Sequence, residues 1–476
     1  MRYQILSVFA ALTASAACGD LTSINDNPNG PTDVQPPSML SNAIQTVVDR
    51  VDGPNNNLDT RGGGLWVQYY AEIQYRDEDK YIVRPGVDGE WGMYSGPLED
   101  FQRMINKGVA AGVPNWEAVG RIMKSYVFSV MTDAMGDIPY SEAFQERALL
   151  TPKYDTQQAI YTALFADLAK ASQQIDPAGI GFGSGDIMYG GDMTTWRKFA
   201  NSLRLRLAMH LTNVAPATAQ SEALAAVTAG VFASNDESAQ LMYLASAPNQ
   251  NPVYTNVHVD KRDDYGMSKT LVDSMRSWND PRLPIYAQPN DTGAYEGLPN
   301  GLNDGAGPEL KYISRFGTFW RETPAAPLAL LTYSEVLFLE AEAAERGWIT
   351  GNAAQLYADA IRASMEQYGI ATTAIDAYLA QPRVVYAGGA AGLTQIAYQK
   401  WVSLFMQGME GWTEVRRTGV PALVPGPNAK LTKIPERLPY SDNEAVLNKA
   451  NLDAAVAAQH FSSSTDLTTP LWFTGR

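Results

Sequence analysis

Two pairs of acidic residues come closest, in type and spacing, to the paired carboxylates that cleave glycosidic bonds. The pairs are Asp133 with Asp137 and Glu335 with Glu342. Glu335 and Glu342 lie one above the other along a predicted helix, while Asp137 belongs to a Gly-Asp-Ile-Pro turn. Because nothing places two carboxyl groups across a cleft, ion pairing and capping account for these residues better than catalysis does. A secreted helical glycosidase using Asp or Glu is the competing hypothesis.

Residues for metal, thiol or phosphate chemistry are sparse. The three histidines, His210, His258 and His460, are scattered and form no HExxH motif. The only cysteine is Cys18, and the sequence contains neither a GxSxG elbow nor a GxxxxGK[ST] phosphate loop. We therefore predict no metal site, no cofactor and no catalytic activity. The 36 basic and 51 acidic residues give a net charge of -15, which disfavours nucleic acid as a partner.

Aromatic residues gather in two segments that have the composition of loops. Flat rings beside polar groups suit a sugar, which offers C–H faces for stacking and hydroxyl groups at its edge. The first segment runs from Gly64 to Pro97, and the second lies just before a helix predicted near Leu331. We expect at least one ligand contact among the two segments, whose aromatic residues include Trp66, Tyr75, Trp91, Tyr94, Tyr312 and Trp320.

The N-terminus has the features of an export signal. Arg2 is followed by a mostly apolar stretch, and the small residues Ser15 to Ala17 precede Cys18. A signal ending at a lone cysteine resembles a bacterial lipoprotein, in which that cysteine is lipidated. We predict a signal peptide over residues 1–17, lipidation of Cys18 and a tether over residues 18–39 rich in Asn, Pro and Gly. The alternative is an ordinary secretory signal that leaves Cys18 as a free thiol.

The rest of the chain, residues 40–476, is predicted to form a single, mainly α-helical domain. The segments "LLTYSEVLFLEAEAAERGW" and "GNAAQLYADAIRASMEQYG" predict a helical hairpin of tetratricopeptide type. Small residues suited to close helix packing recur in it: Ala341, Ala344, Ala354 and Ala360. Large irregular loops near residues 52–97, 245–328 and 417–445 interrupt this helical scaffold.

Two further segments predict amphipathic helices. In "TTWRKFANSLRLRLAMHL" one apolar stripe contains Trp196, Phe199, Leu203 and Leu207, and Thr194 or Thr195 is expected to cap the helix. The segment "IAYQKWVSLFMQGMEGWTEVRR" predicts one long helix. The arginines of these segments are interpreted as internal ion-pair or helix-end partners: Arg204, Arg206, Arg416 and Arg417.

Seven segments, in this order, resemble the SusD/RagB family of outer-membrane nutrient-binding lipoproteins of Bacteroidota. They are "DNPNGPTDV", "TDAMGDIPYSEAF", "TPKYDTQQAIY", "GGDMTTWRKFANSLRLRLAMHL", "WNDPRLPIYAQP", "LTYSEVLFLEAEAAERGW" and "WTEVRRTGVP". The resemblance extends from the tether almost to the C-terminus.

The resemblance implies a tetratricopeptide-like fold, attachment at the outer membrane and no catalysis. It also implies a SusC-like TonB-dependent transporter as partner and an oligosaccharide, or in some members a peptide, as ligand. By chain position, Trp91, Tyr94 and Trp320 become the leading candidates for stacking on the ligand. A third hypothesis keeps the scaffold as a protein-protein module without a small ligand.

Overall fold

The computed structural model describes residues 34–54, 57–84, 91–145 and 148–476. Cys18 and the predicted signal peptide lie outside these residues.

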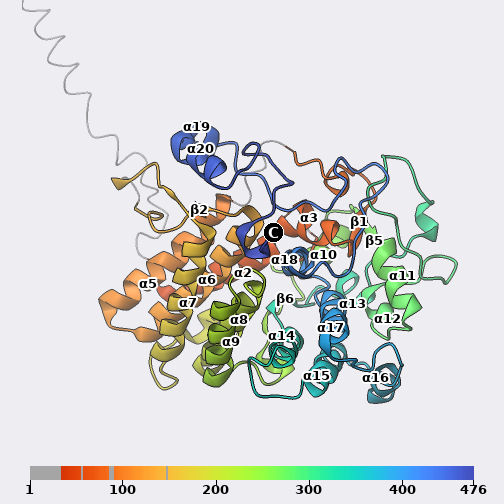
Figure 1. The fold of residues 1–476 in the computed structure, drawn as a ribbon, viewed down its shortest axis with the longest axis horizontal. Helices are drawn as coiled ribbons and strands as arrows, with labels where there is room; N and C mark the ends of the chain where they lie inside the picture. The colour runs from red at the N-terminus through yellow and green to blue at the C-terminus, as the bar shows by residue number, and fades with distance from the viewer. Residues whose placement is uncertain (1–33, 55–56, 85–90, 146–147) are drawn as a thin grey trace, which may run out of the picture.

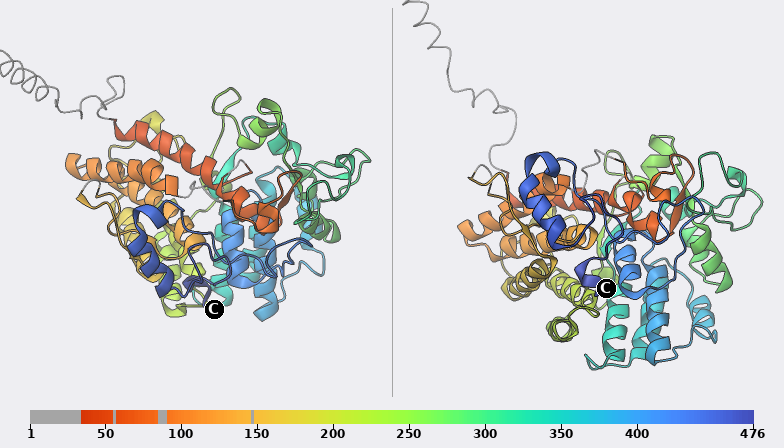
Figure 2. Two further views of the ribbon diagram at one scale, coloured as in Figure 1. Left: turned by 90° about the horizontal axis from the view of Figure 1, so that it is seen from above. Right: turned by 45° about the horizontal axis from the view of Figure 1, so that its top comes forward.

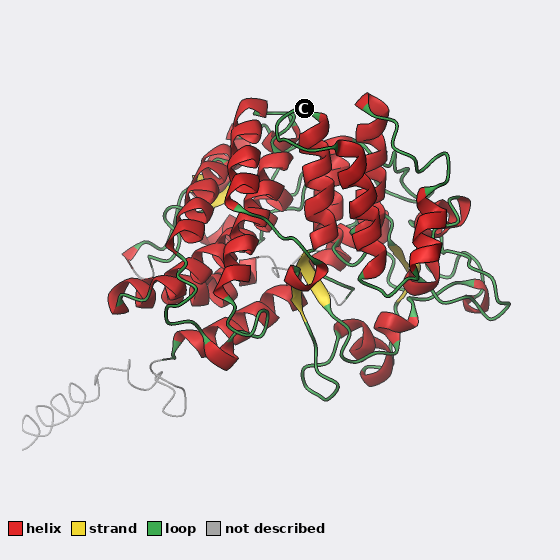
Figure 3. Ribbon diagram, turned by 90° about the horizontal axis from the view of Figure 1, so that it is seen from below, coloured by secondary structure: helices red, strands yellow, loops and turns green. Residues whose placement is uncertain are grey.

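Helices dominate the described chain and strands are few and short (Figure 3), which confirms the predicted fold class. The helices are α2 (Pro36–Val51), α3 (Leu58–Arg61), α4 (Gly63–Trp66), α5 (Glu99–Ala111), α6 (Pro114–Met135), α7 (Gln157–Gln174), α8 (Met193–His210), α9 (Pro216–Ala229), α10 (Pro252–Tyr254), α11 (Lys269–Ser277), α12 (Leu283–Tyr286), α13 (Thr318–Arg321), α14 (Tyr333–Glu345), α15 (Ala353–Glu366), α16 (Thr372–Leu379), α17 (Gly389–Ser403), α18 (Gly408–Thr418), α19 (Glu444–Leu447) and α20 (Lys449–Ala458). The strands are β1 (Tyr70–Glu72), β2 (Ile138–Pro139), β3 (Tyr154–Asp155), β4 (Ala239–Leu241), β5 (Tyr265–Met267) and β6 (Leu328–Leu331).

Successive helices pack side by side in a continuous array (Figure 1). α5 packs on α6, α6 on α7, α7 on α8 and α8 on α9. α8 also contacts α14, which packs on α15 and α17. The array has the helix-on-helix pairing predicted for a tetratricopeptide-like scaffold, and α8 joins its two halves.

Short antiparallel ladders connect segments that are far apart in the sequence. β1 pairs with β5, with Tyr70 opposite Met267, and β4 pairs with β6, with Leu241 opposite Leu328. A third ladder joins β2 to β3. The first ladder therefore places the loop after β1 beside the loop before β5, and the second places β4 beside the segment between α13 and α14.

Helix α8 forms where the apolar stripe predicts it. All four residues of the stripe are buried: Trp196, Phe199, Leu203 and Leu207. The predicted threonine cap is wrong, because the Asp192 side chain accepts hydrogen bonds from the backbone amides of Thr194 and Thr195. The negative charge of Asp192, two residues before Thr194, also interacts favourably with the positive end of the helix dipole, which a neutral threonine hydroxyl does not.

The predicted hairpin is confirmed as α14 and α15. Thr332 caps α14 by accepting from the Glu335 amide, and Asn352 caps α15. Ala341 and Ala360 are fully buried where the helices approach. Ala354 is exposed at the start of α15, so it does not have the expected packing role.

The long helix predicted near the C-terminus is two helices, α17 and α18. Between them, Met406 has a φ of 72°, which a continuous right-handed helix does not allow. The apolar pattern continues across this break because residues on both sides are buried in the same core. Hydrophobic periodicity therefore carried no sign of the break.

Helix α2 runs along one edge of the array (Figure 2) and contacts α5. It begins at Pro36, so the last four residues assigned to the tether are helical, and Met39 is buried. Among the described residues, no helix is both long and apolar enough to span a membrane.

Candidate ligand-binding site

A polar cleft of about 410 Å³ opens beside the β1–β5 ladder. We call it the Tyr75 cleft, and it is lined by Thr60, Arg61, Glu72, Gln74, Tyr75, Glu78, Arg84, Asn256, Asp260, Arg262, Asp264 and Tyr265. Tyr75 is 60% exposed, the most exposed of the aromatic residues that the sequence nominated. The cleft thus offers an aromatic ring together with many hydrogen-bonding groups.

The backbone at Tyr75 is held in an unusual conformation. Its φ is 58°, in the left-handed region that a tyrosine rarely adopts. Its carbonyl oxygen accepts hydrogen bonds from the Asp77 amide, at 2.8 Å, and from Arg84 Nη2, at 2.9 Å. Strained residues of this kind persist where surrounding contacts fix them, and they gather at ligand sites.

Four charged groups of the cleft form two ion pairs with one another. Asp264 accepts from Gln74 Nε2 and from Arg262 Nε, both at 2.6 Å. Burial alone would raise the pKa of Asp264, but these hydrogen bonds outweigh burial and lower it. Arg84 pairs with Glu78 at 3.0 Å. Because these four charges already have partners, an uncharged ligand with many hydroxyl groups suits this part of the cleft.

Glu72 supplies a different kind of group at the floor of the cleft. It is 6% exposed, and burial together with the neighbouring Asp79 carboxylate raises its pKa. A protonated carboxyl group can donate a hydrogen bond as well as accept one. The cleft therefore contains donors and acceptors of several kinds.

Tyr312 lies on the segment that flanks β5. The next residue, Ile313, packs in a small apolar cluster with Ala71 of β1, and Ile73 lies against the same cluster. Tyr312 is 43% exposed, and Lys311 Nζ lies 4.9 Å from the centroid of its ring. The structure therefore brings the segments of Tyr75 and Tyr312, which the sequence placed in two separate clusters, next to each other through Ile313 and Ala71.

Trp91 and Tyr94 belong to a separate, half-buried cluster of rings. Trp91 contacts Tyr94, with ring centroids 5.7 Å apart, and also Tyr154 and Tyr440. The Tyr94 hydroxyl donates to the Pro139 carbonyl at 2.5 Å. Much of the surface of both rings is therefore packed against other parts of the protein, namely α6 and the C-terminal segment.

Trp66 and Trp320 are buried. Trp66 is 0% exposed, packs against Tyr81 and Trp412, and donates from Nε1 to the Glu78 carbonyl. As folded, it has no ring face open to a ligand, so we leave Trp66 out of the proposed site. Trp320 is 2% exposed and borders a different cleft, formed in part by β6 and α13.

The four carboxylates first considered for catalysis have structural partners. Asp133 accepts from the Tyr161 hydroxyl at 2.6 Å, and Asp137 accepts from the Gln157 amide at 2.8 Å. Glu335 pairs with Arg206 and Glu342 with Arg417, all four side chains buried. The interpretation as ion-pair and capping residues is confirmed for this set.

The arginines nominated as internal partners have two kinds of environment. Arg206 and Arg417 form the buried ion pairs, and Arg204 pairs with Glu222 at 2.6 Å. Arg416 differs, because its guanidinium lies 3.6 Å from the centroid of the Trp412 ring and donates to the Glu436 carbonyl. Burial lowers the pKa of Arg416 to about 10.

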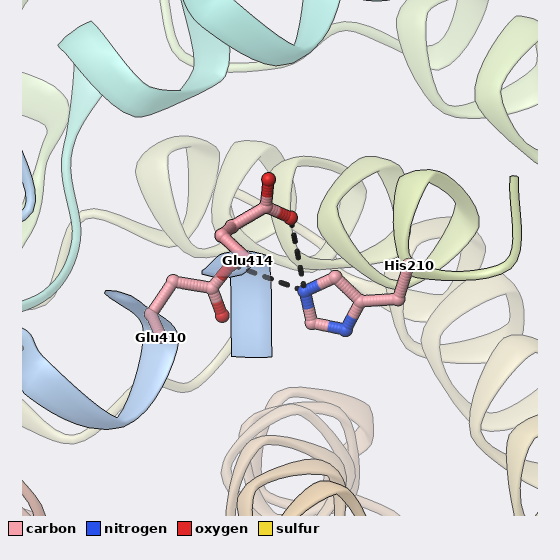
Figure 4. Close-up of side chains that lie close together, drawn as sticks. All are labelled: His210, Glu410 and Glu414. Carbon is pink, nitrogen blue, oxygen red and sulfur yellow. Dashed lines mark hydrogen bonds and ion pairs between the residues drawn. The ribbon is translucent and has the colours of Figure 1, made fainter. Parts of the chain in front are cut away.

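A histidine and two glutamates also meet in the core (Figure 4). Ligand atoms of His210, Glu410 and Glu414 lie within 4.8 Å of one another, a spacing that a metal ion could occupy. Lys400 Nζ, however, lies 3.3 Å from Glu414, and Arg206 Nε lies 3.5 Å from Glu410. Because side-chain cations already face both carboxylates, this cluster is an ion-pair network that joins α8, α17 and α18.

Most of the polar residues of the Tyr75 cleft were not predicted from the sequence. Gln74 and Asp264 are 190 positions apart and meet only because β1 pairs with β5. Neither residue belongs to a motif.

Comparison with known proteins identifies relatives over most of the chain. The family model SusD-like_2, described as "Starch-binding associating with outer membrane", matches residues 28–441. A structure named a chitin-binding protein is 30% identical, covers 92% of this chain and 100% of its own, and has a TM-score of 0.80. A chitin-binding SusD homolog from Flavobacterium johnsoniae is 27% identical, covers 92% of this chain and 97% of its own, and has a TM-score of 0.79. A SusD homolog from Bacteroides uniformis is 26% identical over 93% of this chain and 100% of its own, with a TM-score of 0.82. No curated protein matches the sequence.

Proposed function

Because this chain belongs to the SusD-like family, we propose that it binds a neutral oligosaccharide in the Tyr75 cleft and delivers it to a SusC-like TonB-dependent transporter. The observation that carries the proposal is Tyr75 itself, an exposed ring held at positive φ beside a polar cleft in which two ion pairs, Arg84–Glu78 and Arg262–Asp264, neutralise four of the charges. The names of the relatives describe binding of starch or chitin, which supports a saccharide as ligand and gives the glycosidase hypothesis no support.

The arrangement suits binding without chemistry. A sugar ring can stack its C–H face on Tyr75 while its hydroxyl groups meet the amide of Gln74 and the carboxyl group of Glu72. Tyr312, exposed on the neighbouring segment, is the candidate for stacking on a further sugar unit beyond the residues that line the cleft. We rank Trp91 and Tyr94, the leading candidates from the sequence, behind Tyr75, because both rings are partly buried in contact with other rings.

Tyr75→Ala is expected to weaken oligosaccharide binding about tenfold, which corresponds to the loss of one stacked ring. Isothermal titration of the full chain with chito- and malto-oligosaccharides and with short peptides measures this and distinguishes the ligand classes. Leu150→Ala is the matched control, because Leu150 is 76% exposed and does not line the cleft. Saturable saccharide binding that Tyr75→Ala leaves unchanged would remove the site assignment, and binding of peptides alone would replace the ligand class.

The lipid anchor gives a second test. We expect the protein with Cys18 intact to incorporate labelled fatty acid and to sediment with outer membranes, whereas Cys18→Ser should do neither. Secretion of both proteins in the same unlabelled form would contradict the anchor. The family description, which places its members at the outer membrane, supports attachment there.

A further inference from the structure

A second cleft, of about 480 Å³, lies between the β4–β6 ladder, α13, the end of α15 and the break between α17 and α18. It shares no lining residue with the Tyr75 cleft. We call it the Tyr368 cleft. Its volume is in the range of small-ligand sites, and its lining differs in chemistry from that of the first cleft.

Aromatic rings form one wall of the Tyr368 cleft. Tyr368 contacts Phe319 and Trp320 edge to face, with ring centroids 5.3 and 5.6 Å apart. Trp320 packs in turn on Phe405. Phe319 and Tyr368 are only partly buried, so these two rings border the opening while Trp320 and Phe405 support them from behind.

Uncharged amides supply the polar part of the lining. Gln240 and Gln367 are half-buried, and Gln407 is 4% exposed. Among the described residues, Gln407 Oε1 has no hydrogen-bond partner. A hydroxyl or N–H group of a ligand that reached this oxygen would supply the donor that it lacks.

The charges of the lining exclude one class of ligand. Asp236 and Glu366 are its charged residues, and both are exposed at the rim. The lining contains no lysine or arginine. A phosphate, a sulfate or an acidic sugar would therefore meet like charge with no cation to offset it.

The backbone that brings Gln407 to the wall is itself unusual. Met406, which lines the cleft, has a φ of 72° and is 3% exposed. This conformation is strained for any residue other than glycine and persists only where surrounding packing fixes it. Met406 lies between the end of α17 and the start of α18 at Gly408. Its conformation orients the next residue, Gln407, whose side-chain amide lines the cleft.

We infer that the Tyr368 cleft is a second binding site for a neutral saccharide unit, separate from the Tyr75 cleft. Rings at the opening provide a surface for the C–H face of the sugar, and amides behind them pair with its hydroxyl groups. Planar amides both donate and accept, which matches hydroxyl groups better than it matches an apolar side chain of a peptide. This inference goes beyond the proposed function, which requires only one site.

The test uses a bulky side chain on a loop, which fills the cleft without changing a residue of any helix. Ala325 lines the cleft on a loop and is half-buried, so Ala325→Trp should block the opening. Ala245→Trp, the same change on an exposed loop outside the lining, is the matched control. Isothermal titration of the full chain with chitotetraose and maltotetraose is expected to show two binding events for the unchanged protein and for the control, and one for Ala325→Trp.

A second variant covers the case in which the tryptophan disturbs folding. Gln367→Ala removes one amide and should weaken only the event that Ala325→Trp abolishes, by about tenfold. A single event that Tyr75→Ala weakens and Ala325→Trp leaves unchanged would overturn the second site while the proposed function stands. If saccharide binding is weakened by Ala325→Trp but not by Tyr75→Ala, the result supports binding in the Tyr368 cleft and overturns binding in the Tyr75 cleft. The absence of any saccharide binding would overturn both.

Discussion

Replacing Arg206 with methionine is expected to destabilise the protein by about 3–5 kcal/mol, because it leaves a buried carboxylate without its partner. Arg206 Nε and Nη2 bind the two oxygens of Glu335 at 2.6 and 2.5 Å. The two side chains are 3% and 0% exposed. Arg206 Nη2 also donates to the Leu330 carbonyl at 2.8 Å, so the same guanidinium fixes the end of β6.

The size of this effect follows from what surrounds Glu335. Burial raises its pKa, Arg206 lowers it, and the nearby Glu410 carboxylate raises it again. Without the guanidinium, Glu335 must take up a proton or stay charged beside Glu410, and either state is unfavourable inside the core. The loss also weakens the packing of α8 on α14. This packing joins the two halves of the helical array.

Denaturant unfolding of the full chain measures the difference. The matched control is Arg103→Met, because Arg103 pairs with Glu99 at 2.7 Å while 56% of its side chain is exposed. That change should cost less than about 1 kcal/mol. The double variant Arg206→Met with Glu335→Leu should recover part of the loss, since the unpaired carboxylate of Glu335 is then removed and Glu410 keeps His210 and Lys400 as partners. Equal losses of unfolding free energy for Arg206→Met and Arg103→Met would show that the buried ion pair stabilises the protein no more than the exposed one does.

The helices were predictable because their signal is local. In α8, four apolar residues at helical spacing specify the buried face, and the structure buries all of them: Trp196, Phe199, Leu203 and Leu207. The α14–α15 hairpin follows from two such patterns and the short turn between them. The same signal failed at Met406, because a chain that is buried on both sides of a break keeps its apolar periodicity through the break.

The ligand site was predictable only as a set of candidates. Tyr75 and Trp66 lie in one aromatic segment, yet Tyr75 is 60% exposed and Trp66 is 0% exposed. The difference comes from Trp412, a residue of α18 that covers Trp66 and has no counterpart over Tyr75. Composition records which rings are present, whereas the exposure of each ring depends on distant segments that pack against it.

The polar half of the site depends even more on tertiary structure. Asp264 reaches the Tyr75 cleft through the pairing of two three-residue strands, which have too few residues to show alternation in the sequence. Gln407 reaches the Tyr368 cleft because the chain breaks between α17 and α18. Neither position is marked by a motif, so a structure was needed to assemble either cleft.

The second large effect is expected from His210, as a loss of stability at alkaline pH. His210 is buried, and each ring nitrogen faces a carboxylate: Nδ1 lies 3.0 Å from Asp133 and Nε2 lies 3.1 Å from Glu410. Both nitrogens can donate only if the ring is an imidazolium. Burial alone would lower the pKa of His210, but the charge of Glu410 and the hydrogen bonds to Asp133 and Glu410 raise it to about 9.

The sign follows from comparison with the unfolded chain, in which a histidine has a pKa of about 6.5. The folded protein holds this proton more tightly, so its contribution is complete below pH 6.5 and is lost as the pH rises through 9. The difference between the two pKa values corresponds to about 3 kcal/mol. Denaturant unfolding between pH 6 and 10 should show this loss in the unchanged protein and not in His210→Gln.

Other groups titrate in the same range, so the comparison must be between the two proteins at each pH. Burial raises the pKa of Asp79 to about 7 and lowers that of Lys124 to about 8, and both shifts are common to the protein and its variant. Subtracting the two stability curves leaves the contribution of His210 and its partners on α6 and α18. A difference that falls by about 3 kcal/mol between pH 6.5 and 9.5 means that the imidazolium holds these helices together. A difference that does not change with pH means that the ring is neutral in the fold, and one of the two carboxylates must then carry the proton that the short contacts require.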